Sequence, residues 1–201
     1  MKKVKDHYFH KAKQDGYVAR SAYKLEEIEK KHRLLKGGQR ILDLGCCPGS
    51  WLQYVSGRLK GNGNIVGLDL QPVTVKLPDN VQVLQQDIFE IPLDGTFFKE
   101  PFDLILSDMA PKTTGIKNVD NQRSYDLCVH ALRVADIYLK NGGNLLVKYF
   151  QGQHFQQLKI DFQKQYQQVH IIKPQSSRSE SVEIFVLGMN KKIQDRTIPQ
   201  A

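Results

Sequence analysis

Hydrophobic positions along this chain follow two patterns, short apolar runs and longer amphipathic stretches, which alternate from residue 40 onward. Short runs rich in Val, Ile, Leu and Phe are typical of strands buried on both faces of a sheet. They predict strands over residues 40–44, 64–70, 81–85, 102–108, 144–150, 169–174 and 182–188. The amphipathic stretches predict helices from about residue 50, over about 121–139 and over about 153–166. This alternation indicates a mostly parallel sheet wrapped by helices.

The last predicted strand, VEIFVLG, differs from the others because no helix precedes it. The segment PQSSRSES, rich in turn-forming residues, connects it to the preceding run VHIIKP. A connection of this kind suits a hairpin. We therefore expect one antiparallel strand in an otherwise parallel sheet.

A further helix is predicted over residues 21–33, SAYKLEEIEKKHR. Ser21 is a candidate N-cap, and Ala22, Leu25 and Ile28 share one face. Glu26/Lys30 and Glu27/Lys31 stand at the spacing that favours ion pairs along a helix. The Gly37-Gly38 pair is expected to end this helix.

The 201 residues fit one domain, with residues 1–36 as a basic N-terminal segment and helix and residues 189–201 as a short tail. No apolar run reaches the length of a membrane span, and the N-terminus lacks the apolar core of a signal peptide. The three cysteines, Cys46, Cys47 and Cys128, cannot all pair, which favours reduced thiols and a cytoplasmic location. No histidine stands at zinc-site spacing to Cys46 and Cys47, so no metal site is expected.

Positive charge is concentrated at the N-terminus. The whole chain carries a net charge of +8, and residues 1–40 contain twelve Lys or Arg against five Asp or Glu. Tyr8, Phe9, Tyr17 and Tyr23 lie between these cations, a mixture that can hold phosphates and stack on bases. The same composition also fits a solvated segment, so both interpretations stay open at this point.

A glycine-containing loop, LDLGCCPGSW, follows the first predicted strand of the alternating region. It lacks the GK[ST] of a Walker loop and the GxGxxG of a dinucleotide fingerprint. Asp69 ends the next strand about twenty residues beyond Gly49, where a carboxylate can accept both hydroxyls of a ribose. Asp87 follows the third strand, where it could accept the amine of adenine. Each aspartate alone could be a turn or cap residue, but together they predict an adenosine ligand without a pyrophosphate, such as S-adenosylmethionine.

Charged residues also mark the ends of later strands. Asp108 follows the fourth strand and Lys148 closes the fifth, so a shared sheet edge would bring them together. Glu183 begins the last strand. A lysine at the end of an apolar strand can also simply extend its ammonium group into solvent, so these residues alone do not define a reaction.

The sequence resembles the FtsJ (RrmJ/RlmE-like) RNA 2'-O-ribose methyltransferases through ARSAYKLEEI, LDLGCCPGSW, GLDLQP, QQDIF, LSDMAPKTTG, LLVKYFQG and KPQSSRSESVEIFVLG. The resemblance implies a Rossmann-like S-adenosylmethionine-dependent methyltransferase fold, with a mostly parallel seven-stranded sheet, one antiparallel strand and helices on both faces. It places the catalytic tetrad on Lys24, Asp108, Lys148 and Glu183. It places the cofactor contacts on Gly49, Trp51, Asp69, Asp87 and Asp108.

Two departures from the family pattern stand out. Cys46-Cys47 occupy positions where small alanines are common, and Lys112 stands where asparagine is usual. Lys112 puts one local RNA contact in doubt, and we expect the thiols to serve as small apolar side chains.

The resemblance implies that Lys148 removes the proton from a ribose hydroxyl while Lys24, Asp108 and Glu183 position and tune it. The expected partner is a uridine ribose of large-subunit ribosomal RNA, acted on by a monomer. The alternatives are a ribose in the tRNA anticodon loop, a base or small-molecule methyltransferase, and a ribosome-assembly factor with dispensable chemistry. SDMAP favours the ribosomal group, because the tRNA group tends to have SDGAP.

Overall fold

The computed structural model describes residues 7–178 and 180–193. It contains a seven-stranded sheet of order β3-β2-β1-β4-β5-β7-β6. The strands are β1 (Arg40–Leu44), β2 (Asn64–Asp69), β3 (Val81–Gln85), β4 (Phe102–Ser107), β5 (Leu139–Phe150), β6 (Tyr166–Ile172) and β7 (Glu183–Lys191). The helices are α1 (His7–Gln14), α2 (Ala22–His32), α3 (Ser50–Leu59), α4 (Lys117–Tyr138) and α5 (Phe155–Gln165), with a short 3-10 turn η1 (Ile88–Glu90).

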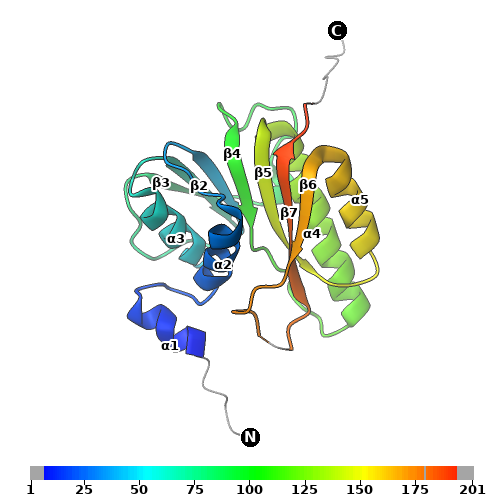
Figure 1. The fold of residues 1–201 in the computed structure, drawn as a ribbon, viewed down its shortest axis with the longest axis horizontal. Coiled ribbons are helices and arrows are strands. Elements are labelled where there is room, and N and C mark those ends of the chain that lie inside the picture. The colour runs from blue at the N-terminus through cyan, green and yellow to red at the C-terminus, as the bar shows by residue number, and fades with distance from the viewer. Residues whose placement is uncertain (1–6, 179, 194–201) are drawn as a thin grey trace, which may run out of the picture.

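The first five strands are parallel, and β7 lies between β5 and β6 and runs antiparallel to both. This confirms the predicted Rossmann-like topology and its hairpin (Figure 1). The chain order reverses beside β1, where connections leave toward β2 on one side and β4 on the other. Ligands of open α/β sheets bind at such a switch point, beyond the carboxyl ends of the strands.

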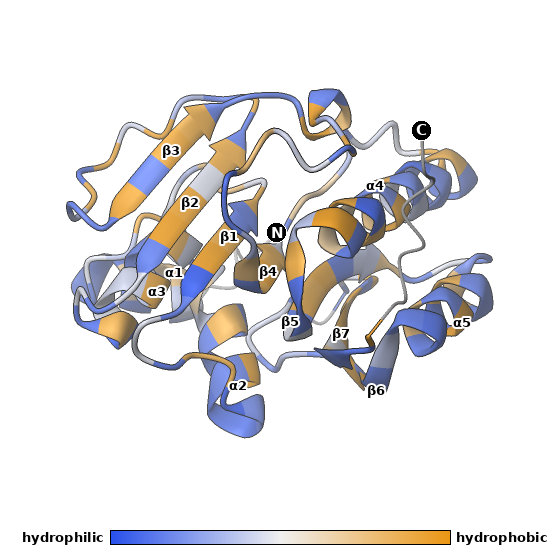
Figure 2. Ribbon diagram, turned by 90° about the horizontal axis from the view of Figure 1, so that it is seen from above, coloured by the Kyte–Doolittle hydropathy of each residue, from blue (hydrophilic) through white to orange (hydrophobic). Residues whose placement is uncertain are grey.

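Helices cover both faces of the sheet. Leu25, Ile28 and Leu52 of α2 and α3 are fully buried against Ile41 and Leu104 of the sheet. On the other face, α4 and α5 pack against β5 and β6 in a second apolar cluster. Figure 2 shows the two helix pairs on opposite sides of largely hydrophobic central strands.

The helix α2 departs from its prediction in three details. Ser21 has helical backbone angles and makes no capping bond, because its Oγ atom lies 2.7 Å from Ser50 Oγ. The helix ends at His32 through a left-handed Arg33, whose N–H donates to Glu29 O, so Gly37-Gly38 is not its stop. Glu26 and Lys30 form the expected ion pair at 2.7 Å, whereas Glu27 accepts main-chain N–H groups of a distant loop.

The N-terminal aromatic residues mostly hold α1 in place. The Tyr23 ring lies 5.5 Å from that of Tyr8 and 5.9 Å from that of Tyr17, and Tyr23 is buried. Phe9, by contrast, is 48% exposed. Tyr23 is therefore not available to stack on a base in this fold, while Phe9 is.

Within the described residues, no helix combines the length and apolarity that a membrane crossing requires. Residues 1–6 and 194–201, parts of the predicted basic segment and of the predicted tail, lie outside the described residues.

Candidate active site

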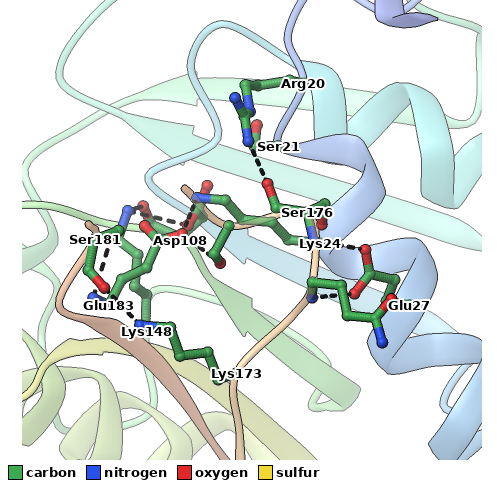
Figure 3. A network of polar contacts seen from close by, with 12 residues as sticks. Arg20, Ser21, Lys24, Glu27, Asp108, Lys148, Lys173, Ser176, Ser181 and Glu183 are labelled. Atoms are coloured by element: carbon green, nitrogen blue, oxygen red, sulfur yellow. Dashed lines mark hydrogen bonds and ion pairs between the residues drawn. The ribbon is translucent and has the colours of Figure 1, made fainter. Parts of the chain in front are cut away.

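Four charged side chains from four elements meet at the carboxyl edge of the sheet. Lys24 comes from α2, Asp108 follows β4, Lys148 lies near the end of β5, and Glu183 begins β7. Lys148 Nζ lies 3.0 Å from Asp108 Oδ1 and donates to Asp108 O at 2.5 Å. Lys24 Nζ lies 2.6 Å from Glu183 Oε1. The four predicted tetrad residues thus form two ion pairs, Lys148 with Asp108 and Lys24 with Glu183 (Figure 3).

Glu183 is held in its charged form. Burial raises the pKa of its carboxyl, but the hydrogen bond and charge of Lys24, a hydrogen bond from Ser177 and the charge of Lys148 outweigh burial and leave this pKa below its ordinary value. Ser177 Oγ donates to Glu183 Oε1 at 2.8 Å, so the same oxygen receives both the serine and Lys24. This carboxylate is fixed from two sides.

A cavity of about 830 Å³ opens beside this tetrad, beyond the carboxyl ends of β1, β2 and β4. Its walls come from the loop after β1, the ends of β2 and β3, the segment after β4, and the first half of α4. The lining of the cavity includes Gly45, Asp69, Asp87, Phe89, Asp108 and Met109.

The floor of the cavity requires a glycine after β1. Gly45 has φ +75°, and a Cβ atom there would collide with the side chain of Met109. Any larger residue would displace Met109, which follows Asp108 in the chain. The glycine loop therefore sets the position of the segment that carries the tetrad aspartate.

The two predicted adenosine-binding carboxylates both line the cavity. Asp69 Oδ2 accepts the N–H of Cys47 at 2.9 Å, and Asp69 Oδ1 accepts the N–H of Gln71 at 2.8 Å. Asp87 Oδ1 accepts the N–H of Phe89 at 2.9 Å. These bonds fix both carboxylates, and each oxygen can accept a further hydrogen bond from a ligand.

A further carboxylate, which interacts with the charges of Asp108 and Asp69 on the cavity walls, is fully buried. Asp43 on β1 is 1% exposed, and neither of its side-chain oxygens has a protein hydrogen-bond partner among the described residues. Burial, followed by the charges of Asp108 and Asp69, raises the pKa of Asp43 well above its ordinary value. A negative charge at this position is costly in the ligand-free protein.

These features fit S-adenosylmethionine. The cavity has the size of a small-molecule site, and the Asp69 and Asp87 carboxylates on its walls could accept hydrogen bonds from ribose hydroxyls and an adenine amine. Asp69 and Asp87 would hold the nucleoside, and Gly45 leaves room beside Met109.

Gly49 and Trp51 lie outside the cavity walls. Gly49 has φ +110°, and a Cβ atom there would lie 2.9 Å from Val75 and 3.0 Å from Val73, so this glycine makes room for the loop after β2. Trp51 is 2% exposed, donates its indole N–H to Ser21 O at 2.8 Å and packs against Phe185. A direct contact of either residue with the cofactor stays a prediction.

Of the two cysteines of the loop, Cys47 lines the cavity and Cys46 does not. Cys46 is buried, and a Cβ atom on Gly67 would lie 2.9 Å from Cys46 Sγ, so the thiol fills a space between strand and helix. Burial raises the pKa of both thiols, Cys46 and Cys47. Thiolates are therefore disfavoured at both positions.

Comparison with known proteins decides the family. The family model of the FtsJ-like methyltransferases matches residues 17–191 of this chain. The chain belongs to the FtsJ-like methyltransferase family. The expectation of an S-adenosylmethionine-dependent RNA methyltransferase is thereby confirmed at the level of the family.

Individual FtsJ-like relatives agree along almost the entire chain. The chain is 46% identical over 192 residues to ribosomal RNA large subunit methyltransferase E of Bdellovibrio bacteriovorus, covering 94% of this chain and 97% of the relative. It is 47% identical over 191 residues to the protein of the same name from Desulfatibacillum aliphaticivorans, covering 94% and 91%.

A solved structure extends the likeness to three dimensions. A ribosomal RNA methyltransferase from Plasmodium falciparum superimposes with a TM-score of 0.78 at 31% identity, covering 89% of this chain and all of that one. The fibrillarin pre-rRNA processing protein of Methanococcus jannaschii shares only the fold, with a TM-score of 0.59 at 15% identity.

The sequence did not single out Ser177 or Glu27, which surround the tetrad in the fold. Ser177 lies in a serine-rich turn, and nothing in its local sequence separates it from its neighbours. Glu27 stands at the spacing of a helix ion pair with Lys31, a common surface pattern that concealed its long-range contact.

Proposed function

We propose that this FtsJ-like methyltransferase transfers a methyl group from S-adenosylmethionine to a ribose 2'-hydroxyl of RNA, on a uridine of large-subunit ribosomal RNA. One observation supports this most directly. Asp108 both lines the 830 Å³ cavity and pairs with Lys148, so a basic side chain stands beside the wall of the cofactor site. A hydroxyl placed at that wall can lose its proton as it attacks.

The chemistry divides among the four residues of the tetrad. S-adenosylmethionine supplies an activated methyl group when bound. Lys148, in its neutral form, accepts the proton of the 2'-hydroxyl, and Asp108 orients its Nζ atom through two contacts. Lys24 and Glu183 balance each other's charge beside this pair. Together the four residues hold the 2'-hydroxyl and the Lys148 Nζ atom in the orientation that the reaction needs.

The ribosomal target is supported by two kinds of observation. The curated relatives at 46% and 47% identity carry the name ribosomal RNA large subunit methyltransferase E. The segment after β4 reads SDMAP, the form typical of the ribosomal group. We further propose that the protein acts as a monomer in the cytoplasm. Its three cysteines are free thiols, and free thiols are typical of that compartment.

The test offers the enzyme two RNAs. Undermethylated large ribosomal subunits and unmodified tRNA are incubated separately with the protein and methyl-labelled S-adenosylmethionine, and label is mapped as nuclease-resistant 2'-O-methyl dinucleotides. We expect label on a ribose of the large subunit. Label on tRNA alone would overturn the target, label on a base would overturn the reaction, and cofactor binding without any transfer would favour an assembly factor.

A further inference from the structure

The loop between β6 and β7, described over residues 173–178 and 180–182, lies against α2 beside the tetrad. It reaches Glu183 through Ser177, whose hydroxyl donates to Glu183 Oε1. The loop also closes on itself, because Lys173 Nζ donates to Ser181 O at 2.6 Å and Glu183 N donates to Ser181 Oγ at 3.2 Å. The position of Ser177 therefore depends on what anchors this loop to the rest of the fold.

Glu27 of α2 provides that anchor. One carboxylate oxygen accepts the N–H of Gln175 at 2.6 Å, and the other accepts the N–H of Ser176 at 2.9 Å. The Arg20 guanidinium donates to Ser176 O from the segment that precedes α2. Ser176 itself is fully buried. Two charge-assisted bonds to consecutive amides hold the loop in one orientation (Figure 3).

The spacing along α2 explains why one helix can do this. Glu27 follows Lys24 by three residues, so the two side chains project from the same face of the helix. Lys24 reaches Glu183 directly at 2.6 Å, and Glu27 reaches it indirectly through the loop and Ser177. The Glu183 carboxylate is thus held by α2 along two separate routes.

We propose that Glu27 is a positioning residue for methyl transfer, acting through Gln175, Ser176 and Ser177 to fix the Glu183 carboxylate in the tetrad. This inference rests on the proposed function and adds a residue to its machinery. Neither Glu27 nor any described residue of the loop, 173–178 and 180–182, lines the cavity. Cofactor affinity should therefore be independent of Glu27, while the rate of transfer should depend on it.

The experiment compares Glu27→Gln with Glu26→Gln. The control removes the same charge from the neighbouring position of the same helix, where Glu26 forms an ion pair with the exposed residue Lys30. In Glu27→Gln, an amide NH₂ replaces one acceptor and faces a main-chain N–H. Single-turnover transfer to undermethylated large subunits, at saturating cofactor and below the thermal midpoint of each variant, should fall about 10-fold, since a misplacement of 1 Å can cost about 10²-fold. The dissociation constant for S-adenosylmethionine should stay at the wild-type value.

Two further measurements separate positioning from general stability. In a Ser177→Ala background, Glu27→Gln should lower the rate by less than about 2-fold, because the route to Glu183 is already broken. Amide hydrogen exchange at residues 175–178 should accelerate in Glu27→Gln and not in Glu26→Gln, with no RNA present.

Each outcome has a distinct meaning. An unchanged rate in Glu27→Gln with an active wild type would overturn the proposal, as would full additivity with Ser177→Ala. Wild-type protein that transfers no label would overturn the proposed function instead, and unchanged exchange at residues 175–178 would then still refute the anchor.

Discussion

At the scale of single residues, the active site depends on where charges are paired and where they are not. Lys148 and Asp108 form one pair at 3.0 Å, and Lys24 and Glu183 form the other at 2.6 Å. Asp43 on β1 is buried, and its side-chain oxygens have no hydrogen-bond partner in the described part of the chain. Burial raises the pKa of the Asp43 carboxyl, whereas at Glu183 the hydrogen bond and charge of Lys24 outweigh burial and leave the pKa below its ordinary value.

The assignment of Lys148 as general base predicts the behaviour of two variants. Lys148→Ala should lower single-turnover transfer by about 10² or more, while cofactor affinity stays near wild type, because the lysine acts on the RNA hydroxyl. Lys148→Arg should be equally slow, because a guanidinium keeps the positive charge but does not give up its proton. Lys140→Ala, at the exposed start of the same strand, is the control. Near-normal transfer by Lys148→Ala would show that another group takes the proton.

Asp43 predicts a pH dependence of stability in the cofactor-free protein. Its pKa is higher in the folded than in the unfolded state, so its contribution is most favourable below about pH 4 and is lost as pH rises toward the folded pKa. Asp43→Asn removes this group at nearly constant volume. The unfolding free energy of the variant, relative to wild type, should therefore rise with pH above about 4, by up to about 1.4 kcal/mol per pH unit. Urea unfolding from pH 4 to 8 measures this, and parallel curves for the two proteins would contradict it.

At the scale of elements, buried polar contacts join β7 to α4. Lys191, the last residue of β7, is 4% exposed. Its Nζ atom donates to Ala135 O, Asp136 O and Leu139 O at 2.7–2.9 Å. These carbonyls belong to the end of α4 and the start of β5, where the helix dipole favours a cation. Lys191 thus caps the carboxyl end of α4, which has no glycine at its C-cap position.

This contact predicts a large stability effect at one position and a small one next to it. Lys191→Met should lower the free energy of unfolding by about 2 to 4 kcal/mol, because several buried carbonyls lose their donor. Lys192→Met removes a single exposed hydrogen bond to Gln163 O and should cost less than about 1 kcal/mol. Urea unfolding of both variants measures the difference, and equal midpoints would mean that the Lys191 contacts add nothing to stability.

At the scale of the whole molecule, positive charge and the active site share one edge. Figure 1 shows α1 at the bottom, near the loop that joins β6 to β7. The cations of α1 lie over aromatic rings, with Lys11 Nζ 4.6 Å from the centre of the Tyr23 ring and Lys13 Nζ 4.8 Å from that of Phe9. An RNA backbone docked on this segment would lead toward the tetrad.

RNA affinity should therefore depend on salt through the N-terminal lysines. Five of these are replaced together by glutamine: Lys2, Lys3, Lys5, Lys11 and Lys13. The plot of log affinity against log salt should become flatter by up to about 4 units, at about 0.9 per lost phosphate contact. The control removes five lysines elsewhere: Lys60, Lys99, Lys140, Lys159 and Lys164. Filter binding to large-subunit RNA over a range of salt concentrations measures both slopes. Equal slopes for the two variants would mean that the N-terminal lysines are solvated and do not bind RNA.

The sequence by itself determined the family and the order of the strands and of helices α2 to α5, whereas the helix α1 was not predicted. A continuous apolar run of strand length indicates a strand buried on both faces, and an amphipathic stretch indicates a helix buried on one face. Each pattern can be recognised within its own segment of the sequence. The seven strands, the antiparallel β7 and the positions of Asp108 and Lys148 at neighbouring strand ends follow from that pattern and from parallel pairing. The motifs around Gly45 and Asp69 added the cofactor, because the chemistry of adenosine binding needs those residue types at those strand ends.

Only the tertiary structure decided which long-range partners the polar side chains found. Glu27 looked like a surface residue beside Lys31, yet it binds amides almost 150 positions away. Ser21 looked like a helix cap and instead contacts Ser50, and the predicted cofactor contact Trp51 is buried and donates its indole N–H to Ser21 O. A polar group accepts any donor of suitable geometry, so its partner is set by packing of the apolar core and not by its own sequence neighbours.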